Sequence, residues 1–112
     1  MTATKKYKLR PEEIKKLIPP IGGCMATDKI TVDGELVDFM YREEPDFKND
    51  SGWRFLSGSE TQDYADNPDN WTIYDTNTIA NYDKSIIPYL VLPIDSELER
   101  INGTETFKLI EK

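Results

Sequence analysis

The chain has 112 residues, and its 21 acidic and 14 basic side chains give a net charge of −7 at neutral pH. This length favours a single compact domain, which can bury a sufficient apolar core without disulfides or metal ions. The negative charge argues against nucleic acid and anionic membrane surfaces as partners, because their phosphate groups repel an acidic protein.

The N-terminal part of the chain is expected to be loose at first and then helical. Residues 1–10 are predicted to form a loose N-terminus, and residues 11–112 are predicted to form the one domain. A helix is predicted to begin at Pro11, because proline suits the first helical position and the two following glutamates suit the positive helix end. Its apolar face would carry Ile14, Leu17 and Ile18.

Short strands are predicted for the middle of the chain. Residues 24–27 form the first of them, and Asp33-Gly34 is a turn signal. Residues 37–42 alternate in a way that predicts a strand with one apolar face, made by Val37, Phe39 and Tyr41. The next strand repeats this alternation with Trp53, Arg54 and Phe55.

The second half of the chain mixes further short elements. They are helical turns at 60–65, a strand at 71–74, a brief helix through Tyr82 capped by Asp75, a strand at 89–92, and a hairpin of 98–101 and 106–110. Short strands, short helices and many turns predict an α+β fold. We expect a single compact domain with a largely antiparallel sheet and two or three short helices.

The segment from Glu43 to Asp83 concentrates the negative charge. It holds ten acidic and two basic residues, so its net charge is −8, whereas the rest of the chain has a net charge of +1. It also contains both tryptophans and five asparagines. Loops of this chemistry present carboxylates, amides and aromatic rings to a partner. The charge favours a basic protein, a cationic ligand or a hard metal ion as that partner.

Side chains of this segment are candidates for binding or for structure. The predicted partner-binding residues are Asp46, Asp50, Trp53, Asp66, Asp69, Asn70, Trp71, Asp75 and Asn77. The predicted structural ion pairs involve Arg42, Arg54, Glu43 and Glu44. Two alternatives stay open: the polar residues around Pro68 could serve only as turn formers, and Trp53 could be a core residue rather than a contact.

No catalytic residue is predicted. The chain has no histidine, so Ser-His-Asp and Cys-His nucleophile systems cannot form. Ten acids in one segment make some carboxylate pair unavoidable, so such a pair is a weak signal for a hydrolase. Cys24 follows two glycines, which could expose a thiol, but a buried small apolar residue is the favoured interpretation.

No metal site and no cofactor are predicted either. The run from Asp66 to Asn77 superficially resembles a calcium loop, but Trp71 stands at its glycine position and Asn77 at its glutamate position. A non-standard metal site stays open as an alternative. The first residues lack the apolar stretch of a signal peptide, so a cytoplasmic location is expected.

Two ordered runs of residues resemble a known bacterial family. The first is MYREEPD at residues 40–46 followed by DSGWRF at residues 50–55, and the second is centred on NTIANYD at residues 77–83. Over residues 22–100 the chain resembles the immunity protein thirty-three-like domain family, which was first catalogued as a domain of unknown function and is assigned to polymorphic toxin systems. The resemblance implies an immunity role and brings no catalytic set with it.

Charge segregation and resemblance together predict a non-enzymatic acidic binding module. In this hypothesis the chain is an immunity protein that neutralises a cognate bacterial toxin by occlusion. A nuclease-type toxin fits best, because an acidic plug complements a basic active site. The alternative is a cytosolic regulatory or ligand-binding domain of unknown partner, including a metal-binding one, and a small hydrolase ranks third.

Overall fold

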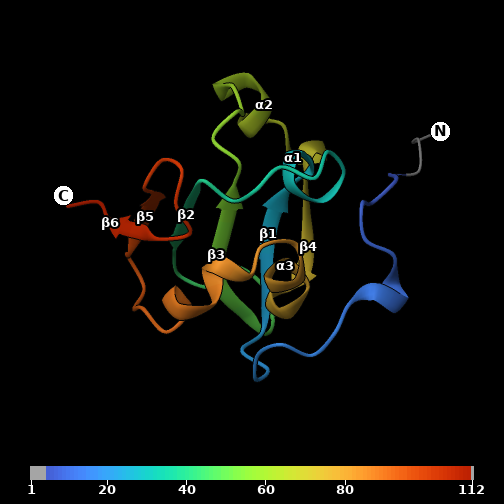
Figure 1. The fold of residues 1–112 in the computed structure, drawn as a ribbon, viewed down its shortest axis with the longest axis horizontal. Coiled ribbons are helices and arrows are strands. Elements are labelled where there is room, and N and C mark those ends of the chain that lie inside the picture. Colours follow the sequence, from blue (N-terminus) through green and yellow to red (C-terminus); the bar gives the residue numbers. More distant parts are fainter. Residues whose placement is uncertain (1–4, 112) are drawn as a thin grey trace.

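A computed structural model describes residues 5–111, which build a six-stranded sheet with short helical segments covering one of its faces (Figure 1). The strands are β1 (Gly23–Thr27), β2 (Phe39–Arg42), β3 (Asp50–Leu56), β4 (Trp71–Asp75), β5 (Glu97–Arg100) and β6 (Phe107–Leu109). Their order in the sheet is β4-β1-β3-β2-β5-β6. Only β1 and β3 pair in parallel among these neighbours. The predicted α+β class with a largely antiparallel sheet is confirmed.

The helical segments are short. They are α1 (Asp28–Thr31), α2 (Gln62–Asp66) and α3 (Thr76–Tyr82), with 3-10 turns η1 (Pro11–Glu13), η2 (Pro68–Asn70) and η3 (Lys84–Tyr89). Asp75 caps α3 as predicted, because its side chain accepts a hydrogen bond from the backbone N–H of Asn77 at 2.9 Å. Within residues 5–111, no helix combines the length and the apolar character that crossing a membrane requires.

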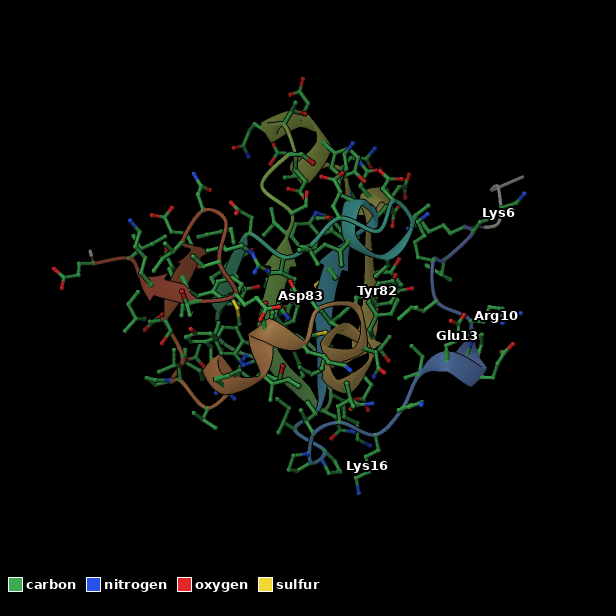
Figure 2. All side chains as sticks on the ribbon, in the orientation of Figure 1. Lys6, Arg10, Glu13, Lys16, Tyr82 and Asp83 are labelled. Carbon is green, nitrogen blue, oxygen red and sulfur yellow. The ribbon has the colours of Figure 1, made fainter. Side chains whose placement is uncertain are left out.

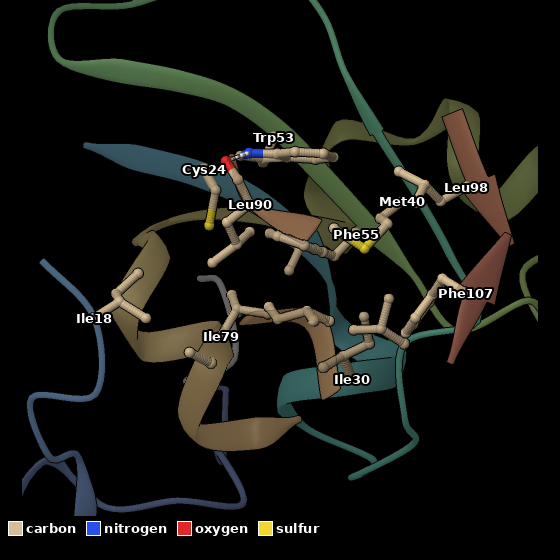
Figure 3. Close-up of a cluster of buried hydrophobic side chains, with 14 residues drawn as sticks. Ile18, Cys24, Ile30, Met40, Trp53, Phe55, Ile79, Leu90, Leu98 and Phe107 are labelled. Carbon is tan, nitrogen blue, oxygen red and sulfur yellow. Dashed lines mark hydrogen bonds between the residues drawn. The ribbon is translucent and has the colours of Figure 1, made fainter. Parts of the chain in front are cut away.

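The hydrophobic core lies between one face of the sheet and the segments α1, α3 and η3 (Figure 3). Trp53 and Phe55 stack at the centre of this face with their ring centroids 6.2 Å apart. The indole Nε1 of Trp53 donates a hydrogen bond to the carbonyl oxygen of Leu90 at 3.2 Å. Both side chains are fully buried. Trp53 is therefore a core residue in this fold, and a partner cannot reach it.

Strand β2 turns the opposite face to the core from the one predicted. Met40 is fully buried, and it lies opposite Phe55 on one side and Leu98 on the other. Phe39 and Tyr41 are only half-buried and lie on the face opposite the core. The alternation was ambiguous because β2 carries apolar side chains on both faces, and the register with β3 decides between them.

The helix predicted to begin at Pro11 is wrong beyond its first turn. Only η1 forms, with Arg10 and Glu13 at its two ends (Figure 2), and the chain then continues without helix past α3. The side chain of Asn77 accepts hydrogen bonds from the backbone N–H groups of Leu17 and Ile18. Asn77 thereby takes backbone donors that a helix would have used internally.

Other local predictions had mixed outcomes. The strand predicted at 89–92 is wrong, because η3 and a turn occupy this region, where Ile86 and Leu90 face the core. The C-terminal hairpin is confirmed as β5 and β6. Of the segment expected to be loose, residues 1–4 lie outside the described residues. Residues 5–10 contact the domain: for example, the backbone N–H of Lys8 donates to the carbonyl of Thr31 at 2.8 Å.

Gly52 is required by an irregularity in the central strand. The pairing of β1 with β3 shifts register between Gly23 and Met25, and Gly52 adopts a φ of +91° in the displaced stretch. A Cβ atom on Gly52 would lie 2.2 Å from the carbonyl oxygen of Glu43. Only glycine combines this backbone conformation with such a close approach.

We expect Gly52→Ala to destabilise the domain strongly. The added methyl group cannot be accommodated by a side-chain movement, because it meets backbone, so the loss should exceed about 3 kcal/mol. Gly103→Ala is the matched control: Gly103 has a φ of +77° and nothing within 4 Å of its Cβ position. The control should lose only about 1 kcal/mol. Urea unfolding followed by tryptophan fluorescence measures both, and equal losses would contradict the steric role of Gly52.

Candidate functional site

The face of the sheet opposite α1, α3 and η3 is the candidate site. Its middle row is Ile73 of β4, Met25 of β1, Arg54 of β3 and Tyr41 of β2, each opposite the next in the strand register. We call this surface the open face, and its second row contains Trp71, Thr27, Leu56 and Phe39. Ile73 is 54% exposed, which is unusual for isoleucine in a strand. The open face therefore presents apolar and aromatic side chains to solvent.

A buried ion pair lies in the middle of the open face. The guanidinium of Arg54 donates to both carboxylate oxygens of Asp50, at 3.0 Å from Nη1 and 2.7 Å from Nη2. The side chains of Arg54 and Asp50 are only 2% and 0% exposed. Backbone N–H groups of Asp46 and Gly52 also donate to Asp50 at 2.8 Å. Every charge in this pair is thus matched by hydrogen bonds, as burial demands.

The protonation states of this pair follow from its contacts. Burial alone would raise the pKa of Asp50, but the hydrogen bonds from Arg54 and from two backbone N–H groups hold that pKa below its usual value. Burial would lower the pKa of Arg54, and the hydrogen bonds to Asp50 and Glu43 raise it instead. Both groups are therefore charged at neutral pH and neutralise one another.

Glu43 adds a third charge at the edge of this pair. Its Oε2 accepts a hydrogen bond from Nε of Arg54 at 2.6 Å, while half of the Glu43 side chain is exposed. Because Asp50 already balances Arg54, the three groups together carry one net negative charge. The structure thus directs an excess carboxylate toward solvent beside the middle of the open face.

A depression of about 260 Å³ lies directly above Arg54. Its apolar wall consists of Met25, Tyr41, Ala65, Pro68 and Trp71, and the carboxylates of Glu43 and Asp66 belong to its lining as well. Tyr41 is half-buried, and its pKa is raised first by this burial and then by the charge of Glu43. The depression is therefore an aromatic recess beside two carboxylates.

The segment containing α2 and η2 forms one side of the depression. Glu60 holds this segment to the sheet, because its Oε2 accepts hydrogen bonds from Oγ1 of Thr27 at 2.5 Å and from the backbone N–H of Ser57 at 2.8 Å. Trp71 of β4 provides a second attachment for this segment, because its indole Nε1 donates a hydrogen bond to the carbonyl oxygen of Ala65 at 2.8 Å. The acidic turn around Pro68 is thus fixed relative to β1 and β4.

A second, wider groove of about 740 Å³ lies at the other end of β1 and β4. Its lining comes from residues 20–23, 47–50 and 73–75. Phe47 packs over Gly23 here, where a Cβ atom would lie 3.0 Å from the phenyl ring. Ile73 contributes to this groove, so apolar surface continues from it across β4.

Comparison with protein-family models places this fold in a known family. The model for the Immunity protein Imm33 domain matches residues 24–111, a stretch that runs from β1 to the end of β6. The chain belongs to the Imm33 immunity protein family. Comparisons with curated proteins and with solved structures gave no significant match.

The residues predicted to bind a partner occupy different places in this Imm33 domain. Four carboxylates are exposed, namely Asp46, Asp66, Asp69 and Asp75. Trp71 and Asp66 meet at the depression, and Asp75 lies beside the wider groove. Asp50 and Trp53 are buried, Asp50 in the ion pair and Trp53 in the core. Asn70 and Asn77 are half-buried, and their side-chain amides form hydrogen bonds with backbone groups of this domain.

The four residues predicted to form structural ion pairs also separate. Arg54 pairs with Glu43 and with Asp50, which had been assigned to the binding set. Arg42 donates instead to the backbone carbonyls of Ser51 at 2.8 Å and Leu92 at 2.7 Å. Its guanidinium lies 5.7 Å from the ring centre of Trp53. Glu44 is exposed.

Sequence reasoning missed several residues of the open face. Met25, Tyr41, Phe47, Ile73 and Glu60 were not assigned to any site. An alternating pattern was visible for Tyr41, but alternation does not tell which face is covered by helices. Ile73 lay in a predicted short strand with no such pattern. The hydrogen bond from Thr27 to Glu60 spans 33 residues, and no local signal announces it.

The sequence left open a reactive thiol at Cys24 and a non-standard metal site, and the structure of the Imm33 domain bears on both. Cys24 is fully buried in the core, and burial raises the pKa of its thiol. A thiol in this state is not a nucleophile. Across residues 5–111, no three carboxylate or thiol groups gather closely enough to hold a metal ion together.

We expect Arg54→Met to cost about 3–5 kcal/mol of unfolding free energy, because it leaves the carboxylate of Asp50 buried without its cation. The double variant Asp50→Asn/Arg54→Met should recover part of this loss, since no charge then stays buried. Glu43→Gln is the control and should cost less than about 1 kcal/mol, because Glu43 is half-exposed. Urea unfolding gives all three values. An Arg54→Met loss no larger than that of Glu43→Gln would contradict a structural ion pair.

Proposed function

We propose that this Imm33 protein neutralises a bacterial toxin by covering the toxin's active site with its open face. The observation that carries the proposal is an exposed apolar and aromatic sheet surface flanked by carboxylates. Ile73, Trp71 and Tyr41 supply the kind of side chains that anchor protein interfaces. Membership of an immunity protein family supplies the class of partner, which is a toxin.

The distribution of charge supports a basic partner. Of the ten acidic residues between Glu43 and Asp83, three face inward: Asp50, Asp83 and Glu60 are held by Arg54, Arg100 and Thr27 respectively. The other seven are exposed, namely Glu43, Glu44, Asp46, Asp63, Asp66, Asp69 and Asp75. Such a surface attracts a basic protein and speeds encounter with it. A nuclease-type toxin fits this field, because an active site that binds nucleic acid is basic.

Occlusion without chemistry is the mechanism that fits the contacts on the open face. The inward carboxylates that could serve in acid–base steps are engaged with fixed partners, such as Asp50 with Arg54 and Glu60 with Thr27. The pKa of Glu60 lies below its usual value, because these hydrogen bonds outweigh its burial. A carboxylate in this state accepts hydrogen bonds and does not act as a general acid at neutral pH.

The partner can be captured from cells that naturally contain this protein and then expressed alone. We expect growth arrest from the partner alone and normal growth when the Imm33 protein is expressed with it. Ile73→Lys should weaken binding at least about tenfold and abolish this rescue, because it removes an exposed apolar contact and adds a positive charge to the open face.

Val91→Lys is the matched control. Val91 is 85% exposed in the turn after η3, on the helical side of the sheet, and the substitution changes the net charge by the same amount. This variant should bind and rescue normally. A harmless captured partner would overturn the immunity role, and rescue by Ile73→Lys would move the interface away from the open face.

A further inference from the structure

The depression above Arg54 has the shape and charge of a receptor for one side chain. We propose that it receives an arginine or lysine side chain of the toxin, an inference that rests on the proposed function. Its volume of about 260 Å³ is smaller than the usual range for small-molecule sites. A single long side chain from a protein surface is therefore a better match than a free metabolite.

The walls of the depression suit the stem of such a side chain. Trp71 of β4 and Tyr41 of β2 are both half-buried and line it. Met25 lines it as well, from β1, which lies between β4 and β2 in the order of the sheet. Arginine and lysine pack their methylene stems on apolar surface of this kind. Aromatic rings also attract the cation at the end of the stem.

The charges of the lining disfavour an anionic or a neutral apolar side chain in the depression. Arg54 is the one cation among the described residues of this lining, and Asp50 balances it through two hydrogen bonds. Glu43 and Asp66 then remain as excess carboxylates. Asp66 accepts a hydrogen bond from Nε2 of Gln62 at 2.8 Å, which orients it without neutralising it. An anionic side chain would meet two like charges, and a neutral apolar one would desolvate both without compensation.

The two tryptophans make the proposal testable by nuclear magnetic resonance. The indole N–H of Trp71 lies beside the depression, whereas that of Trp53 lies in the core and donates to Leu90. Titration with a capped Gly-Arg-Gly peptide should shift the Trp71 indole signal and leave the Trp53 signal in place. The matched peptide carries citrulline, which has the same shape as arginine without its charge, and it should shift the Trp71 signal much less.

Two charge variants separate the depression from the general acidic field. The pair Glu43→Gln/Asp66→Asn should weaken binding of the arginine peptide roughly three- to tenfold, as expected for two partly exposed charges. The pair Glu44→Gln/Asp46→Asn removes the same charge from exposed residues outside the lining. This second pair should bind the peptide like the wild type. Melting curves of both variants check that each one folds.

Three results would overturn the proposal. They are equal shifts with arginine and citrulline peptides, a Trp71 indole signal that does not move selectively, and equal weakening by the two charge variants. None of these results bears on rescue from the toxin, which is measured separately. If rescue holds while the peptide fails, the open face remains the interface and the depression is filled by another part of the toxin.

Discussion

The ion pair between Arg54 and Asp50 is the constraint on which the arrangement of the open face depends. Its two side chains are almost completely buried, so each charge must find its partner at a fixed position. Asp50 and Arg54 are four residues apart in β3, and the alternation of side chains along a strand puts both on the same side. The pairing of β3 with β1 shifts register between them, where Gly52 adopts its positive φ. The same carboxylate receives the backbone N–H of Asp46, and this contact fixes the loop that carries Phe47. A single buried pair thus joins the central strand to the acidic loop beside it.

The two faces of the sheet differ: one carries the hydrophobic core, and the other carries the candidate site. Trp53 and Phe55 fill the core under α3 and η3, whereas Arg54, between them in sequence, points into the open face. The core and the candidate site therefore share the strand β3. The side chains of the open face lie on paired strands, and Arg54 among them is held by hydrogen bonds to Asp50 and Glu43. A rigid surface loses little conformational entropy when it binds.

Local signals in the sequence predicted the elements whose structure is decided locally. The Asp75 cap, the C-terminal hairpin and the alternation of Trp53 and Phe55 depend on neighbouring residues, and all three were correct. The helix after Pro11 failed because Asn77, sixty residues away from Leu17, takes its backbone donors. The prediction for β2 was wrong because both of its faces carry apolar side chains. Only the register with β3 determines that Met40 faces the core.

The candidate site could be predicted in its chemistry and not in its geometry. The concentration of carboxylates and tryptophans was visible in the sequence, but the sequence does not tell which of these side chains are buried in the fold. Asp50 is buried in its ion pair with Arg54, and Trp53 is buried in the hydrophobic core, so neither is available to a partner. Met25 and Ile73 join the surface only because β1 and β4 pair in one particular register. The composition of this surface is thus a property of strand pairing, which no short motif records.

Amide hydrogen exchange, measured on this protein alone and in complex with its captured toxin, tests the assignment of the open face most directly. The assignment predicts added protection in β4 and in the segments 43–49 and 57–70, which border the open face. It predicts unchanged exchange in α3 and in the turn that contains Val91, because these lie on the helical side. Protection concentrated in α3 and η3, with unchanged exchange along β4, would contradict it.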